Sequence, residues 1–299
     1  PGTLTEDNLL ERKTNNFLGA ISDNNGSVSI AWVDVSTGSF KSRNILDDKK
    51  SNRKQLLANF LLRMDFSELL ISEDFDLDLI VEEWHSILKK QSSSLFHYPS
   101  CLDQILSYYS IVSLEGVGAF SEGEIKAAAV LLSYLKLTQC GKIPILSMIQ
   151  TETQNNFLEI DYFTQKSLEI FKNLSGGSEG SLISCLDETK TACGARLLKQ
   201  RVIEPFYKIE QIQDRYDLTN WILENNINIS QFQIDFENIP DIERSLSRIS
   251  LSRGGPRDLL LMSSGLLIIK GIYENLVSHN QAKITPTLLN FIINNLDID

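Results

Sequence analysis

The hydrophobic periodicity changes once along the chain, and this change constrains the fold more than any other feature. In the first 142 residues, short β-prone runs such as 17–21 and 28–33 alternate with stretches whose apolar residues recur at helical spacing. Beyond that point the pattern is helical to the end, apart from a short strand-like run at 157–160. We therefore predict a mixed α/β domain over residues 1–142, followed by a mostly α-helical domain over residues 143–299.

Three antiparallel strands are expected to open the first domain. Turn-forming residues at Asp23–Gly26 and Ser36–Gly38 separate three β-prone runs, the third of which includes Phe40. The further elements predicted for this domain are a helix around 56–61, a strand at 69–71, a helix over 78–90, a strand at 95–98 stopped by Pro99, and helices over 101–109 and 121–138. The last helix begins with a capping-box signature, Ser121 and Glu124.

The second domain is predicted to contain helices over 162–174, 191–203, 209–223, 242–251, 256–280 and 285–296. Both domains are acidic. The first carries 14 basic and 19 acidic residues and the second 14 and 20, which together give the net charge of 28 − 39 = −11. Because binding to polyphosphate requires a surplus of Lys and Arg, charge alone does not indicate nucleic acid as a partner.

Three absences in the sequence bear on the compartment in which the protein is expected. No uninterrupted apolar run approaches the roughly 18 residues of a membrane span, and the first residues show no leader pattern, so no membrane partner is expected. The four cysteines show no C-x-x-C spacing. We expect reduced thiols and a cytoplasmic protein, and the missing initial Met suggests a piece of a longer chain.

One turn offers a candidate catalytic carboxylate. Asp34 is followed by Val-Ser-Thr-Gly at the end of a β-run, which is typical of a metal-binding turn when further acids such as Glu68, Glu73 or Asp74 lie nearby. The same residue types suit any tight turn, because they cap backbone groups and tolerate positive φ. We favour the structural interpretation and keep, as the alternative, a metal-dependent nuclease using Asp34, Glu68 and Glu73.

Other catalytic motifs are incomplete. The glycine-rich stretch 176–181 lacks the Lys of a P-loop, and the His and Cys residues are too scattered for a zinc site. The sequence therefore predicts neither a P-loop nor a zinc site. A Ser/His or Cys/His nucleophile stays open at this point, because its partners can be distant in the chain.

Two further sequence features have structural explanations. The basic residues Arg244, Arg248, Arg253 and Arg257 form two pairs four residues apart, each able to share a helix face, and interleaved acids favour ion pairs over phosphate contact. Gly194 interrupts a good helical pattern, which suggests that another part of the chain packs closely against it.

Two longer motifs resemble the MutS family of DNA mismatch-recognition ATPases. The segment 180–198 matches the family pattern G-[ST]-L-x-x-x-L-D-x-T-x-T-x-x-G-x-R-x-L. The segment 248–259 is similar to R-[IL]-x-L-x-R-x-x-P-R-D-L. The residues of this sequence that carry the two motifs are Asp187, Thr189, Thr191, Gly194, Arg196, Arg248, Arg253, Pro256, Arg257 and Asp258. The start of the chain, Pro1–Glu6, resembles the family's linker into the connector domain, and the turn 34–38 resembles a turn of that domain.

The resemblance implies an RNase H-like connector domain without nuclease activity over 1–142, followed by the first part of a helical core (lever) domain. In the longer parent it implies a P-loop ATPase using ATP and Mg²⁺, a homodimer, and mismatched DNA as ligand. It implies MutL as a further partner, and places polar residues Asp103 and Gln104 on the MutL-facing surface. For this chain alone it implies no enzymatic activity, no catalytic residue, and no cofactor or metal.

Overall fold

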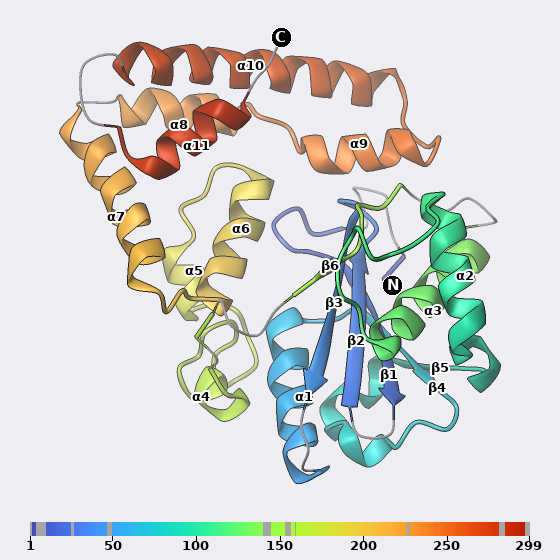
Figure 1. Cartoon of the computed structure of the whole chain (residues 1–299). Coiled ribbons are helices and arrows are strands. Elements are labelled where there is room, and N and C mark those ends of the chain that lie inside the picture. Colours follow the sequence, from blue (N-terminus) through green and yellow to red (C-terminus); the bar gives the residue numbers. More distant parts are fainter. Residues whose placement is uncertain are drawn as a thin grey trace. The chain divides into compact units, whose positions relative to one another are not determined.

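The computed structural model describes most of the chain as two compact units (Figure 1). The described residues are 2–3, 10–24, 27–46, 50–139, 145–152, 157–158, 160–225, 228–280 and 285–296. The first unit comprises residues 1–153, 160–169 and 247–253, and the second comprises 154–159, 170–246 and 254–299. The position of the period change near residue 142 and most of the expected linker at 1–6 lie outside the described residues.

A mixed sheet forms the centre of the first unit. Its strands are β1 (Phe17–Asn24), β2 (Ser27–Asp34), β3 (Ser39–Leu46), β4 (Glu68–Ser72), β5 (Leu88–Gln91) and β6 (Gln150–Thr151). Their order is β5-β4-β1-β2-β3-β6, with β2 antiparallel to β1 and β3 and the other neighbours parallel. The predicted opening of three antiparallel strands is confirmed, and the order β3-β2-β1-β4-β5 is that of an RNase H-like sheet.

Helices cover both faces of this sheet because alternate strand residues are apolar on each side. On one face Ala31 and Val33 of β2 join a buried cluster with α3 (Glu122–Thr138) and α2 (Tyr98–Tyr109). On the other face Ile30 and Trp32 join a cluster with α1 (Lys50–Met64). The near-continuous burial of β1 and β2 follows from this two-sided covering.

The capping box predicted at the start of α3 is present. Ser121 Oγ accepts a hydrogen bond from Glu124 N at 3.3 Å, and Ser121 N donates to Glu124 Oε2 at 2.9 Å. The helix then packs so closely on β2 that a Cβ built on Gly123 would lie 2.4 Å from Ser29 Oγ. A glycine is therefore required at this contact.

Two predicted elements of the first unit are wrong. The segment expected as a helix over 78–90 forms the short 3₁₀ turns η1 (Leu77–Leu79) and η2 (Glu82–Ile87), followed by β5. Pairing with the exposed edge of β4 stabilises the end of this segment as a strand, which helical periodicity does not reveal. The expected strand at 95–98 is instead the end of η3 (Ser93–Phe96) and the start of α2. Pro99 lies in the first turn of α2, where a missing N–H costs nothing, so it starts a helix and does not stop a strand.

A segment after α3 returns along the edge of the sheet. Tyr109 Oη, at the end of α2, donates to Ser147 O at 2.7 Å, and Ser147 Oγ accepts from Phe40 N at 3.1 Å. Ser147 N donates to Gly38 O at 2.8 Å. The segment 145–152, which ends in β6, is thus fastened to both α2 and β3.

The described part of the second unit is helical. Its helices are α5 (Leu182–Leu186), α6 (Ala192–Ile203), α7 (Ile209–Glu224), α8 (Ile229–Glu237), most of α9 (Ile242–Ser250), α10 (Pro256–Asn280) and α11 (Thr287–Asn295). The predicted helices over 191–203, 209–223, 242–251, 256–280 and 285–296 are confirmed to within two residues. The strand-like run at 157–160 contributes only an isolated bridge between Phe157 and Phe206. The predicted helix over 162–174 is reduced to α4 (Tyr162–Ser167), which belongs to the first unit, because Glu169 adopts positive φ and ends it.

The second unit buries little apolar surface among its described residues. Its core cluster contains two buried side chains, Trp221 and Leu289, with neighbours from α7, α8, α10 and α11 packed around them. By length and composition, residues Pro256–Ser278 of α10 meet the requirement for a membrane-spanning helix, although Lys270 interrupts the apolar residues. Because charged and polar residues interrupt it, this helix contains no uninterrupted apolar run of that length.

Candidate functional site

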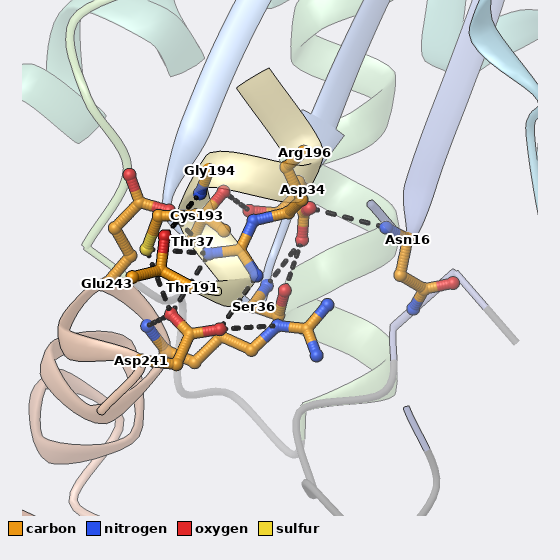
Figure 2. A network of polar contacts seen from close by, with 11 residues as sticks. Asn16, Asp34, Ser36, Thr37, Thr191, Cys193, Gly194, Arg196, Asp241 and Glu243 are labelled. Atoms are coloured by element: carbon orange, nitrogen blue, oxygen red, sulfur yellow. Dashed lines mark hydrogen bonds and ion pairs between the residues drawn. The ribbon is translucent and has the colours of Figure 1, made fainter. Parts of the chain in front are cut away.

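The Asp34 carboxylate holds a tight turn at the end of β2. It accepts hydrogen bonds from Ser36 N at 2.9 Å, Ser36 Oγ at 2.6 Å and Asn16 N at 3.3 Å, and the residue is fully buried (Figure 2). Gly38 N donates to Asp34 O at 2.8 Å, and Gly38 has a φ of +78°. Glycine is favoured at such a φ, so the Asp-Val-Ser-Thr-Gly sequence is explained by the turn itself.

The carboxylates of the nuclease alternative do not converge. In the sheet register, Asp34 is paired with Phe17 and Glu68 with the next residue, Leu18. Because successive strand residues point to opposite faces, Asp34 and Glu68 project from opposite faces of the sheet. Glu73 is exposed beyond the other end of β4. A metal site needs its carboxylates on one side within coordination distance, so the structure gives no support to the nuclease alternative.

Glu68 has a structural role of its own. Its carboxylate is buried and accepts hydrogen bonds from Tyr134 Oη at 2.5 Å and from Gly2 N at 3.3 Å. Burial, together with the bond to this carboxylate, raises the pKa of Tyr134 to about 12. The pair joins α3 to the start of β4.

The two residues expected on the MutL-facing surface both lie on α2 but in different environments. Asp103 is exposed, whereas Gln104 is half-buried and its Oε1 accepts a hydrogen bond from Ser133 Oγ of α3 at 3.0 Å. Asp103 is therefore available to a partner, while Gln104 also fastens α2 to α3.

The first family motif builds the start of α6. Asp187 Oδ1 accepts hydrogen bonds from the backbone N, at 3.0 Å, and the hydroxyl of Thr189. Thr191 is the N-cap of α6, and its Oγ1 accepts from Gly194 N at 2.9 Å. A Cβ on Gly194 would lie 2.7 Å from that same Oγ1. The close packing expected at Gly194 is present, but the neighbour is the helix's own cap and not another helix.

Arg196 is the buried centre of an ion-pair network in the second unit, whose carboxylate Glu243 is exposed (Figure 2). Its guanidinium makes a two-point contact with Asp241, at 2.7 and 3.0 Å, and reaches Glu243 at 2.7 Å. The side chain is 5% exposed. Burial alone lowers the pKa of Arg196, but the bonds to the two carboxylates outweigh it and raise the pKa above its ordinary value. The network therefore fixes α6 against the start of α9 and pairs the buried guanidinium with two carboxylates.

The same network includes a grouping that resembles a metal site. Cys193, Asp241 and Glu243 place one potential ligand atom each within 4.8 Å of one another. The Arg196 guanidinium, however, contacts all three side chains, including Cys193 Sγ at 3.3 Å, and so takes the position of a cation. Burial and the two carboxylates raise the pKa of Cys193 to about 12, which opposes formation of the thiolate that metal binding requires.

The second family motif ends α9 and begins α10. Asp258 Oδ2 accepts a hydrogen bond from Gly255 N at 2.9 Å, and Pro256 is the first residue of α10, as suits its fixed φ. Arg253 N donates to Arg248 O at 2.9 Å beyond the end of α9. The prediction that Arg253 and Arg257 share a helix face is wrong, because α10 begins only at Pro256.

Of the four arginines, Arg244 is confirmed in an ion pair: its Nε lies 3.7 Å from Asp241 Oδ2. Two long-range contacts in the structure have no signal in the sequence. These are the clustering of Cys193 with Asp241 and Glu243 and the hydrogen bond from Ser247 to Val35.

The fold defines a class of protein in which an RNase H-like α/β domain is followed by a helical domain. In this chain the carboxylates of Asp34 and Glu68 hold a turn and a helix in place. Family models for MutS domain II and MutS domain III match residues 16–147 and 163–298. The DNA mismatch repair protein MutS of Wolbachia pipientis wMel is 40% identical over 273 residues, which are 89% of this chain and 31% of that protein. The protein of the same name from Roseobacter denitrificans is 34% identical over 292 residues, 97% of this chain and 32% of that protein.

The chain belongs to the MutS family and contains regions that match its domains II and III. It spans about a third of the length of the curated relatives that it matches.

Proposed function

We propose that this chain is the part of a mismatch repair protein that connects its DNA-binding and ATPase regions, and that its α/β unit docks MutL. The observation that supports this most is the joint match to MutS domains II and III over most of the chain. A connecting role requires two well-defined domains in which polar side chains hold helices and turns in place. The Asp34 carboxylate holds the turn after β2, and the Arg196 network holds α6 against the start of α9.

In this proposal the chain has no ATPase activity by itself and binds no cofactor of its own. ATP, Mg²⁺, homodimer formation and mismatched DNA belong to the longer protein. We also propose that the exposed leucines of α10 serve protein contacts in the cytoplasm and not a membrane. A nucleotide-saturable hydrolysis by the purified chain would contradict the first of these statements.

The experiment that tests the docking role is calorimetric titration of the purified chain with MutL, with a mismatched DNA duplex as a parallel ligand. We expect binding to MutL and none to DNA. Absence of MutL binding would refute a docking surface that works outside the longer protein.

Variants on α2 then locate the surface. Asp103→Ala should weaken MutL binding, whereas Glu210→Ala, which removes an exposed carboxylate from α7, should not. Gln104→Ala is compared with Ser133→Ala, because both remove the same hydrogen bond but only the first removes the side chain at the surface. Equal effects of these two variants would show that Gln104 acts only through the position of α2.

A further inference from the structure

A short segment from late in the sequence completes the first unit. Ser247–Arg253 belongs to this unit, although the residues on either side of it are assigned to the other. Ser247 Oγ donates a hydrogen bond of 2.6 Å to Val35 O, 212 residues earlier in the chain, and the Ser247 side chain is buried. The segment therefore reaches the same tight turn that the Asp34 carboxylate holds.

An apolar contact accompanies this hydrogen bond. Leu251 is 2% exposed and belongs to the buried cluster that also contains Val35, Leu146 and Ile149. Leu251 is the first residue after α9, and its N donates to Ser247 O at 3.1 Å, so the two residues lie one helical turn apart on the same side. Ser247 thus makes a polar contact and Leu251 an apolar contact with the same part of the first unit.

The segment ends abruptly after this turn. Ser252 has a φ of +57°, and Arg253 N donates to Arg248 O at 2.9 Å, which closes the end of α9. The boundary between the two units falls inside α9, between Leu246 and Ser247. The contact is therefore confined to about two helical turns, short enough to open locally without unfolding the sheet.

We propose that Ser247–Arg253 is a latch on the turn 34–38, with Ser247 as its polar contact and Leu251 as its apolar plug. The surface of the α/β unit around this turn is covered by residues 247–253 of the chain itself. When the latch is closed it stabilises the turn, and when it opens it exposes Leu251 and leaves the Val35 carbonyl to water. This inference concerns the chain alone and is independent of the proposed docking of MutL.

Hydrogen exchange followed by mass spectrometry on the whole chain tests the latch. Ser247→Ala should raise exchange in the peptide covering residues 35–38 about five-fold, the change expected for one neutral hydrogen bond. The peptide covering 249–253 should respond with it. The matched control is Ser250→Ala, because the Ser250 hydroxyl donates only to Ser247 O within the same helix.

A second variant, Leu251→Ala, removes the apolar plug and should raise exchange in the turn by more than ten-fold. A peptide from β2 serves as the reference for global unfolding in every variant. Equal exchange of the turn in Ser247→Ala and Ser250→Ala would overturn the proposal. So would a rise in the turn that merely follows the rise in β2.

Discussion

Replacement of Gly123 by alanine tests the packing of α3 on the sheet. The new Cβ would lie 2.4 Å from Ser29 Oγ and 2.8 Å from Ser29 Cβ, both far inside van der Waals contact. Ser29 is fully buried and its hydroxyl donates to Asn44 at 3.0 Å, so it has no space into which to move. Helix α3 must therefore shift away from β2, and overpacking of this kind costs about 1–3 kcal/mol.

Replacement of glycine by alanine is expected to stabilise the chain, not destabilise it, at another position. Gly271 lies in α10, is exposed, and has no atom within 4 Å of a built Cβ. Because alanine is a better helix former, Gly271→Ala should stabilise α10 by up to about 1 kcal/mol. The two variants thus separate steric packing from helix propensity.

Hydrogen exchange under mildly denaturing conditions measures both effects, with peptides from β2 and from α10. We expect exchange in β2 to rise about 5- to 150-fold in Gly123→Ala, and exchange in α10 to fall in Gly271→Ala. Adding Ser29→Ala to Gly123→Ala should give a loss smaller than the sum of the single losses. If Gly123→Ala is neutral or stabilising, the described contact between α3 and β2 is wrong.

Two further predictions concern the Arg196 network. Arg196→Met should destabilise the second unit by about 3 kcal/mol, because it leaves the partly buried Asp241 without its main partner. Burial raises the pKa of Asp241, but Arg196 outweighs it and lowers the pKa in the folded state, so this stability is present above pH about 4 and is lost as pH falls below that value. The variant should lose this acid dependence in urea titrations at several pH values. At pH 8, iodoacetamide should label the exposed Cys185 much faster than Cys193, whose pKa is raised to about 12.

The controls use groups outside the network. Arg257→Met removes an exposed arginine and should change stability by less than about 0.5 kcal/mol. Cys101, buried and with a pKa raised to about 11, should be as protected as Cys193. Rapid labelling of Cys193 in the folded chain, or an unchanged acid transition in Arg196→Met, would contradict the described network.

Two local features of the structure were predicted correctly from the sequence. The capping box at Ser121 and the period change into a helical region depend on residues close together in the chain, and both predictions are confirmed. The helix predicted over 78–90 failed because the decisive partner, β4, lies outside the window that periodicity examines. Pro99 was misinterpreted because proline ends strands and begins helices, and only the helix that follows decides between them.

In the candidate site, too, features set by neighbouring residues were predictable and features set by distant residues were not. The turn at Asp34 follows from its residue types, since Ser36 and Gly38 lie beside it. The opposite orientation of Asp34 and Glu68 depends on strand register, which one sequence does not determine. The bonds from Arg196 to Asp241 and from Ser247 to Val35 join distant positions and have no local signature.

The hydrogen bonds of Ser147 give the end of α2 a mechanical connection to the sheet. A force applied to α2 is transmitted to Ser147 through the hydrogen bond of Tyr109 Oη. Two further hydrogen bonds transmit it from Ser147 to Phe40 and Gly38. The last turn of α2 therefore cannot be displaced without moving the first residues of β3 or breaking one of these bonds. A protein that pulls on this helix works against the sheet itself, and the force enters at the strand next to the turn of Asp34.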